Sequence, residues 1–239
     1  LDETVRVIKP RVIAKLGHSA ACELTLISGA DPLTDDTVVS QFPEHRLLAV
    51  LVKTLKVEAL GSELHGDFKY LASGVLAETG CLYFAPHNAP RVLCVDPSTQ
   101  AVESIGPEFS GESKYSANGV LAQNGRIYFA PYCAQQVLCV EPAEQSVALV
   151  GPRLPGEFKY SSPGVLAADG RIYFAPRNAR HVLCIDPESQ TVETLELELT
   201  CSLKYGAGLL ASNGKAYFAP RNARQVLCLD PQSQAVEFL

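Results

Sequence analysis

The sequence predicts an all-β protein, a β-propeller of five blades with four antiparallel strands each. The dipeptide Lys-Tyr recurs every 45 residues, beginning at Lys69, Lys114, Lys159 and Lys204. A long block around it recurs as well, and it holds four segments of strand length separated by turn signals. A repeated unit of this length with four strands is typical of a propeller blade.

The repeat that begins at Lys114 shows the inner half of a blade. Gly119–Ala122 is a short apolar run, which suits an innermost strand buried on both faces. Asn124-Gly125 then predicts a two-residue type I′ turn, because Asn and Gly tolerate the positive φ that both central residues need. The second strand covers 126–130 and ends at a proline, which has no N–H for the ladder.

The outer half of the same repeat contains two further strands. A third strand is predicted at 136–140 and a fourth at 146–150, joined by a turn that begins at Glu141-Pro142. Tyr128 and Phe129 of the second strand are expected to pack on opposite sides of it, between neighbouring blades, and not to form a stacking platform.

The repeat also predicts the boundaries of the domain. Residues 21–239 form a single propeller, with blades at about 21–65, 66–110, 111–155, 156–200 and 201–239. The first copy is degenerate, because Val38-Val39-Ser40-Gln41 replaces Tyr-Phe-Ala-Pro. Residues 1–20 are left as an N-terminal extension that adds an edge strand or helps to close the ring. A larger propeller would show the same repeats, and a β-solenoid is the weaker alternative because its coils are shorter.

The cysteines are predicted to be unpaired. Four of the eight recur inside a Val-Leu-Cys segment, where Cys serves as a small buried hydrophobic residue: Cys94, Cys139, Cys184 and Cys228. Equivalent positions of neighbouring blades are expected to lie too far apart for a disulfide. Unpaired thiols favour a reducing compartment.

Composition narrows the classes of partner. The net charge of −6 argues against general nucleic-acid binding, which needs clustered Lys and Arg. The apolar runs are too short for a membrane-spanning helix. The chain contains no Met, so we expect that an upstream segment is missing. Removal of a targeting segment would fit an organellar location, but the compartment stays open.

One block of the sequence resembles a known repeat family. Gly164 to Pro187 reads Gly-Val-Leu-Ala, then Tyr-Phe-Ala-Pro, Asn-Ala and Val-Leu-Cys-Ile-Asp-Pro. It resembles tandem β-propeller repeats found in predicted proteins of algae and other protists, and the resemblance covers about 69–239. It implies a propeller fold and no particular catalytic residues. Related families act mainly as interaction platforms, which is an argument from the fold alone.

Positive charge is expected to gather on one face of the propeller. The Lys-Tyr connection and the loop between the second and third strands open on the same face of a blade. The predicted binding residues on this basic face are Lys69, Lys114, Lys159, Lys204, Arg177, Arg180, Arg221, Arg224, His87 and His181. Arg suits an acidic protein surface or an anionic ligand, because its planar donor fork matches a carboxylate. In the structural alternative, each Lys pairs with a nearby acid such as Glu112 or Glu157.

The expected function is that of a non-enzymatic accessory subunit. It would dock through protein–protein contacts on a larger, organellar assembly, and a peripheral place on a membrane complex is compatible with it. No catalytic residue, metal or cofactor is predicted, because the five histidines lack metal-ligand spacing. Two alternatives stay open: a lectin-like propeller or one that binds an anionic small ligand, and a lactonase or hydrolase with a metal in its channel.

Overall fold

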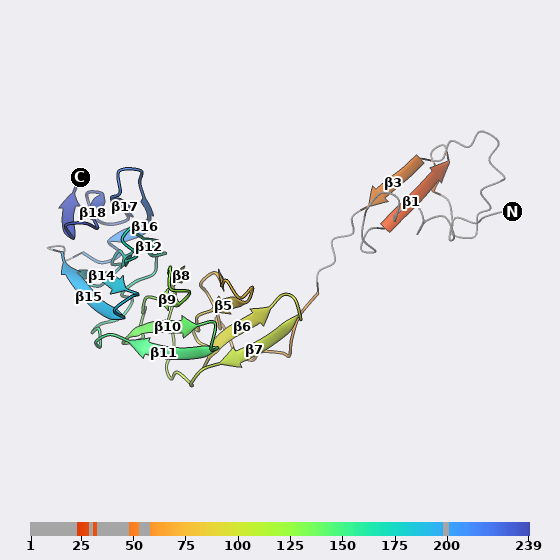
Figure 1. Cartoon of the computed structure of the whole chain (residues 1–239), viewed down its shortest axis with the longest axis horizontal. Coiled ribbons are helices and arrows are strands. Elements are labelled where there is room, and N and C mark those ends of the chain that lie inside the picture. The colour runs from red at the N-terminus through yellow and green to blue at the C-terminus, as the bar shows by residue number, and fades with distance from the viewer. Residues whose placement is uncertain (1–22, 29–30, 33–47, 53–57, 198–200) are drawn as a thin grey trace. The chain divides into compact units, whose positions relative to one another are not determined.

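A computed structural model describes residues 23–28, 31–32, 48–52, 58–197 and 201–239 (Figure 1). The chain divides into two compact units, Leu1–Ala59 and Leu60–Leu239, and each contains its own sheets.

The second unit contains four antiparallel sheets of four strands, one for each regular repeat. We call them blades 1 to 4. Blade 1 has β4 (Val75–Leu76), β5 (Leu82–Phe84), β6 (Val92–Asp96) and β7 (Ala101–Ile105); blade 2 has β8 (Val120–Leu121), β9 (Ile127–Phe129), β10 (Val137–Glu141) and β11 (Ser146–Val150); blade 3 has β12 (Val165–Leu166), β13 (Ile172–Phe174), β14 (His181–Asp186) and β15 (Thr191–Glu196); blade 4 has β16 (Tyr205–Leu210), β17 (Ala216–Pro220), β18 (Leu227–Asp230) and β19 (Ala235–Phe238).

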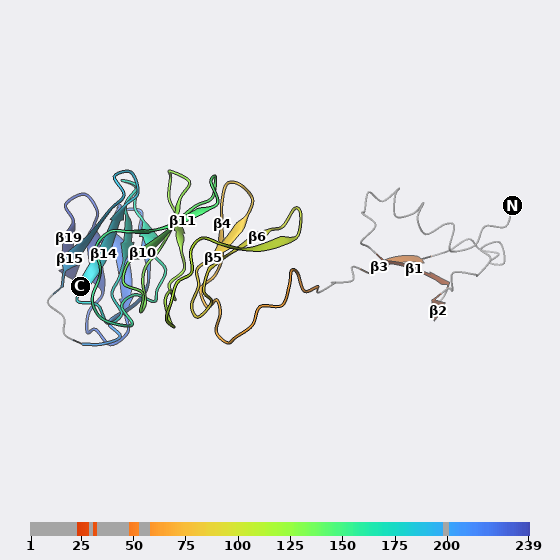
Figure 2. The same ribbon diagram turned by 90° about the horizontal axis from the view of Figure 1, so that it is seen from below.

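The blades follow one another in chain order around an arc (Figures 1 and 2). Strands pair with their sequence neighbours in every blade, and the first strands lie toward the inside of the arc, with β4 beside β8 and β12 beside β16. The prediction of an all-β fold built from four-stranded blades is confirmed. Each blade also lies within one of the predicted ranges from residue 66 onward.

The first unit contains a smaller sheet. Strands β1 (Glu23–Ser28), β2 (Asp31–Pro32) and β3 (Leu48–Val52) form three antiparallel strands in the order β2-β1-β3. The predicted second strand of this copy, at 38–41, and the extension at 1–20 lie outside the described residues. The described residues therefore hold four four-stranded blades and one three-stranded sheet, and a fifth blade at 21–65 stays a prediction.

The turn between the first two strands differs from the prediction. Within the Asn124-Gly125 turn of blade 2 only Gly125 has a positive φ, of 79°, so the turn is not type I′. The Gly125 N–H donates to the Ala122 carbonyl at 3.0 Å, and the Ala122 N–H donates to the Arg126 carbonyl at 2.9 Å. The loop thus has three residues with glycine in the left-handed position, a common alternative for hairpins. The Oδ1 atom of Asn124 accepts the Arg126 N–H at 3.1 Å, and Asn124 itself keeps a negative φ.

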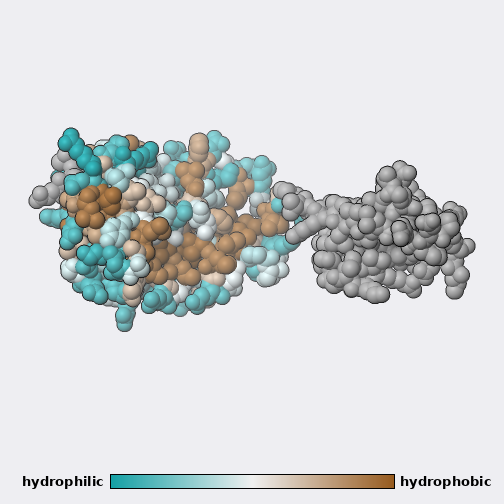
Figure 3. Space-filling view, turned by 90° about the horizontal axis from the view of Figure 1, so that it is seen from above, coloured by the Kyte–Doolittle hydropathy of each residue, from teal (hydrophilic) through white to brown (hydrophobic). Residues whose placement is uncertain are grey.

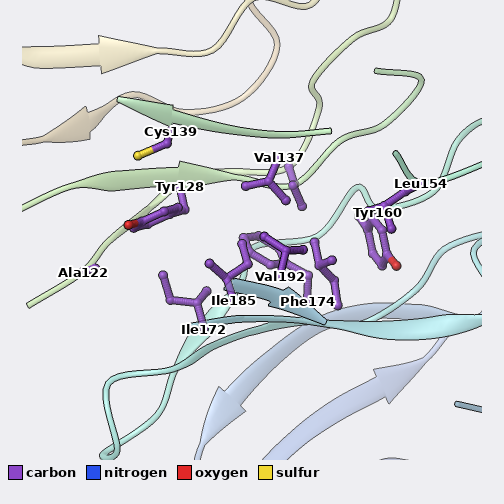
Figure 4. Packing of buried hydrophobic residues seen from close by; sticks show 13 residues of the cluster. Ala122, Tyr128, Val137, Cys139, Leu154, Tyr160, Ile172, Phe174, Ile185 and Val192 are labelled. Atoms are coloured by element: carbon purple, nitrogen blue, oxygen red, sulfur yellow. The ribbon is translucent and has the colours of Figure 1, made fainter. Parts of the chain in front are cut away.

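The hydrophobic core lies between the blades. We call one side of a blade its front face, formed in blade 2 by Ile127, Phe129, Leu138 and Val140, which pack against blade 1. The opposite side is the back face, formed in blade 2 by residues such as Tyr128, Val137 and Cys139, which pack against blade 3 (Figure 4). The same pair of faces joins blade 3 to blade 4. This arrangement confirms that the Tyr-Phe pair packs on both sides of its strand.

The cysteines behave as small core residues. Cys94, Cys139, Cys184 and Cys228 are buried and free, as predicted. Burial raises the pKa of the Cys184 thiol to about 11, which keeps it in the neutral form.

Buried tyrosines make the fold sensitive to alkali. Burial raises the pKa of Tyr83, Tyr128 and Tyr205 from 10.0 to about 12. Between these values the unfolded chain loses the phenolic proton and the folded chain keeps it. The free energy of unfolding should therefore fall from pH 10 to pH 12, by about 1.4 kcal/mol per pH unit for each such tyrosine.

Two measurements check this prediction, urea unfolding at stepped pH and the absorbance of tyrosinate. Burial lowers the pKa of Lys114, Lys159 and Lys204, so these lysines act in the opposite sense, but only up to their ordinary value of 10.5. Ionisation of Tyr83, Tyr128 and Tyr205 should coincide with unfolding. Ionisation of these three tyrosines near pH 10 in a chain that stays folded would contradict the burial described above.

Candidate functional site

The repeated lysines do not form a charged ring at the surface. Lys114, Lys159 and Lys204 are between 1% and 3% exposed. The Nζ atoms of Lys114 and Lys159 donate to the carbonyls of Gly111 and Gly156 at 2.6 Å. Lys69 makes the same bond to Gly66 but is half-buried. The prediction that these lysines belong to a basic binding face is corrected for the three buried ones, whose ammonium groups donate to backbone carbonyls.

The structural alternative also needs correction in its detail. Lys204 donates to the Asn178 carbonyl at 3.4 Å, and no described ion pair joins a repeated lysine to Glu112 or Glu157. Asn88 and Asn178 each accept a backbone N–H of the next blade, whereas Asn88 and Asn222 also donate to carbonyls of the connections into their own blades. The Oδ1 atom of Asn88 accepts the Ser113 N–H of the next blade at 2.9 Å.

Arg177 and His87 belong to a row of side chains that contact one another through Tyr132. Arg177 lies 5.1 Å from the ring centre of Tyr132 and 5.6 Å from that of Phe158, and it donates to the Tyr132 hydroxyl. His87 is buried, its ring centre is 6.2 Å from that of Tyr132, and its Nδ1 lies 3.1 Å from the Tyr115 carbonyl. Arg177 is therefore half-buried and engaged by two rings.

The remaining predicted arginines are exposed. Arg180, Arg221 and Arg224 extend from the loops of blades 3 and 4, and none of them forms an ion pair within the part of the chain that the structure describes. Arg180 lies close enough to Lys204 to help lower its pKa, although burial is the larger cause. Positive charge is thus available at Arg180, Arg221 and Arg224.

A cleft on blade 3 brings several predicted residues together. Its volume is about 960 Å³, and it lies between the connection that enters the blade, the start of β14 and the strand β15. The polar and charged residues that line it are Arg153, Glu157, Lys159, Asn178, Arg180, His181, Glu193 and Thr194. Three of the predicted site residues, Lys159, Arg180 and His181, therefore share this blade 3 cleft. The cleft therefore offers both cationic and anionic side chains.

His181 is the most distinctive side chain of this cleft. Its backbone carbonyl accepts the Tyr160 hydroxyl at 3.1 Å, which fixes the start of β14 against the connection. Its Nδ1 atom is buried and has no hydrogen-bond partner among the described residues. A buried polar atom without a partner is uncommon and carries a desolvation cost.

The same cleft occurs one repeat earlier, with different chemistry. The blade 2 cleft has a volume of about 460 Å³, and Lys114 and Tyr115 occupy it as Lys159 and Tyr160 occupy the blade 3 cleft. At the positions of Asn178, Arg180 and His181 it has Cys133, Gln135 and Gln136. The blade 3 cleft is therefore the larger and the more strongly cationic of the two.

Sequence reasoning did not find Arg153, which lines both clefts. The signal was present, because Arg153 occupies the place of Glu108 in the preceding repeat, in an otherwise similar Gly-Pro-containing connection. A search for departures between repeats would have selected it. Repeats build the blade, so the positions at which they differ carry most of the information on binding.

Acidic residues on the turns at the opposite side of the blades are paired with nearby bases. Asp186 lies 3.7 Å from Arg171, Asp230 lies 3.9 Å from Lys215, and Glu141 is paired with Arg126. These acids are therefore partly neutralised by bases of their own blades.

Within the described ranges, no three His, Cys, Asp or Glu side chains come together as a metal site. No helix among the same residues is long and apolar enough to cross a membrane.

Comparison with solved structures shows the propeller fold. Virginiamycin B lyase from Staphylococcus aureus matches with a TM-score of 0.57 at 13% identity, over 70% of this chain and 54% of the lyase. A catalytically inactive form of that lyase with quinupristin matches with a TM-score of 0.60 at 13% identity, over 91% of this chain and 74% of the lyase. An auxiliary nutrient binding protein from Bacteroides thetaiotaomicron matches with a TM-score of 0.50 at 14% identity, over 72% of this chain and 41% of that protein.

These matches show the fold alone, because identity is low, and the chain spans about half the length of the first two lyase structures. No protein-family model matches the sequence, and no curated protein matches it.

The expected function, a non-enzymatic accessory subunit docked on a larger assembly, is wrong. The structures with a similar fold include virginiamycin B lyase, an enzyme, and an auxiliary nutrient binding protein. The physical basis of the docking hypothesis is also weakened, since three of its lysines are buried.

Proposed function

We propose that this chain binds a small anionic ligand that carries hydroxyl groups, such as an acidic saccharide, in the blade 3 cleft. The observation that carries the proposal is the convergence of Arg153, Arg180 and His181 on a cleft of about 960 Å³. That volume falls within the range of known small-molecule sites.

The lining supports a ligand of mixed polarity. Arg180 is exposed and unpaired within the described part of the chain, so its guanidinium is free to hold a carboxylate through two hydrogen bonds. Glu157, Glu193 and Thr194 offer acceptors for hydroxyl groups, and His181 lines the same cleft. Leu154 and Val192 supply an apolar wall for the carbon skeleton.

The proposal assigns binding and no reaction. Lys159 is the group in the cleft with a pKa lowered by burial, but its Nζ is already held by the Gly156 carbonyl at 2.6 Å. It therefore supports the shape of the cleft and is poorly placed to exchange protons with a ligand.

Calorimetric titration tests this function with glucuronate oligosaccharides and, as an uncharged match, the corresponding glucose oligosaccharides. The unmodified chain should bind the charged series more tightly. Arg180→Gln should weaken that binding about tenfold or more, because a hydrogen bond to a charged group contributes about 1.5–3 kcal/mol.

Gln135→Ala is the matched control, since Gln135 occupies the place of Arg180 in the blade 2 cleft. It should leave the affinity unchanged. Equal affinity of the unmodified chain and Arg180→Gln for glucuronate, or no preference for the charged series, would remove the proposal.

A further inference from the structure

We propose that a second cleft, on the turn side of the blades, binds a small aliphatic diamine and holds one of its ammonium groups at Asp169. This turn-side cleft has a volume of about 730 Å³ and lies where turns of blades 2, 3 and 4 meet. Asn124 of blade 2, Asp169 and Glu188 of blade 3, and Pro231 of blade 4 are among the residues that line it. It lies at the other end of the strands from the blade 3 cleft, so it does not depend on the function proposed above.

The junction between blades 2 and 3 shows how these turns are joined when every polar group is paired. The Nδ2 atom of Asn124 donates to the Pro187 carbonyl at 2.8 Å, and the Tyr128 hydroxyl donates to the same carbonyl at 3.4 Å. The Oδ1 atom of Asn124 accepts the Arg126 N–H at 3.1 Å. One asparagine therefore satisfies its own turn and the turn of the next blade.

The junction between blades 3 and 4 lacks this set of bonds. Asp169 stands at the place of Asn124, and its Oδ1 atom accepts the Arg171 N–H at 3.1 Å in the same way. Its second oxygen cannot replace the Asn124 amide, because an ionised carboxylate only accepts hydrogen bonds. Neither that oxygen nor the Pro231 carbonyl has a hydrogen bond among the described residues.

The Tyr173 hydroxyl is the third unpaired group of this junction. Tyr173 is 0% exposed, and its hydroxyl has no hydrogen-bond partner in the part of the chain that the structure describes. It holds the place of Tyr128, so it faces the turn of Pro231. Burial raises the pKa of Tyr173, and the nearby charge of Asp169 adds to this effect. Buried polar groups are usually paired, so the exchange of one amide for a carboxylate leaves the junction short of a donor.

The turn-side cleft also has an excess of negative charge. Asp169, Asp186 and Glu188 line it, and Arg171 is the one base among the lining residues. Arg171 lies 3.7 Å from Asp186, whereas Asp169 and Glu188 have no ion pair within the described ranges. In Figure 3 hydrophilic residues lie along the upper and lower margins of this unit, and hydrophobic patches lie between them. The lining of the cleft is polar and acidic, so a cationic ligand suits it better than an apolar one.

An ammonium group supplies what the junction lacks. It carries a positive charge and three N–H donors, so it can pair with the Asp169 carboxylate and donate to the Pro231 carbonyl. A metal ion fits less well, because no three His, Cys, Asp or Glu side chains come together among the described residues. Two acids without an ion pair, Asp169 and Glu188, favour a ligand with two ammonium groups, and the volume is within the range of small-molecule sites.

Calorimetric titration of the full chain with 1,4-diaminobutane tests the inference, and 1,4-butanediol is the uncharged match. The unmodified protein should bind the diamine and not the diol. Asp169→Asn should weaken binding of the diamine about tenfold or more, because it removes the carboxylate and restores the amide of the preceding junction. Glu78→Gln is the matched control, since Glu78 lies on the equivalent turn of blade 1, outside the cleft, and should leave the affinity unchanged.

Urea unfolding gives a second reading that does not require a ligand. Asp169→Asn should raise the urea midpoint of the ligand-free chain, because its amide can donate to the Pro231 carbonyl. The diamine should raise the midpoint of the unmodified chain and leave that of Asp169→Asn unchanged. No binding of the diamine, equal affinity of Asp169→Asn, or an equal loss of affinity in Glu78→Gln would overturn the inference. A lower urea midpoint for ligand-free Asp169→Asn would do the same, because it would show that Asp169 is already paired.

Discussion

Phe174→Ala is expected to destabilise the fold by about 3–5 kcal/mol, the range for truncating a fully buried aromatic residue. Phe174 is 0% exposed and lies on the front face of blade 3, within the cluster that joins it to blade 2. Its removal deletes apolar contacts on both sides of that interface and leaves a cavity which the rigid strands cannot fill. Urea unfolding followed by circular dichroism measures the loss.

Phe68→Ala is the matched control for this substitution. Phe68 is 68% exposed, so its truncation should change the free energy of unfolding by about 0.5 kcal/mol or less. Similar losses for Phe68→Ala and Phe174→Ala would show that the core does not lie between the blades.

Gly164→Ala is expected to destabilise the fold although it adds only one methyl group. A Cβ at Gly164 would lie 2.6 Å from the Cζ atom of Phe174 and within 2.9 Å of two further ring atoms. The ring is fully buried, so it cannot move aside without disturbing its neighbours. Overpacking of this kind costs about 1–3 kcal/mol, and the number of close ring contacts places Gly164→Ala at the upper end.

A double-mutant cycle identifies the cause of that loss. Phe174→Leu shortens the side chain at the point of the clash, so Gly164→Ala should cost about 0.5–3 kcal/mol less in its presence. Gly206→Ala is the control, because the nearest atom to a Cβ there is the Ala219 carbonyl oxygen at 3.8 Å. Additive losses in the cycle would mean that the glycine is needed for another reason.

Much of the fold could be predicted because every repeat carries the same strand and turn signals. The Tyr-Phe pair, the glycine before it and the proline after it define a strand with two buried sides, and the structure has that strand at 127–129 and its equivalents. The turn type could not be predicted, because Asn-Gly fits both a two-residue type I′ turn and the three-residue loop that the structure has. In the structure the Asn124 side chain accepts the Arg126 N–H.

The lysines illustrate why the site was harder to predict than the fold. A Lys in a connection between strands is ordinarily exposed. The sequence does not show that the side chain of this Lys folds back onto a backbone carbonyl. The local signal was the glycine three residues earlier, at Gly111 and Gly156, whose positive φ of 87° and 89° accompanies the carbonyl contact with Nζ. A Gly-x-x-Lys segment in a tight connection therefore indicates a hydrogen bond from the lysine to the glycine carbonyl, as well as a positive charge.

Two of the predicted site residues that share the blade 3 cleft are departures between repeats. Arg180 and His181 differ from Gln135 and Gln136 in the preceding repeat, and they share the blade 3 cleft. Residues that recur unchanged, such as Lys114 and Lys159, proved to be buried. The volume of the cleft could not be predicted, because it depends on how the connection at 152–160 lies over β15.

The ligand position is the most direct test of the proposed function. A crystal structure of the full chain with a glucuronate oligosaccharide should show the ligand carboxylate against Arg180 in the blade 3 cleft, and an unoccupied blade 2 cleft. Ligand bound elsewhere on the chain, equal occupancy of both clefts, or none at a concentration that saturates the calorimetric titration would contradict the assignment.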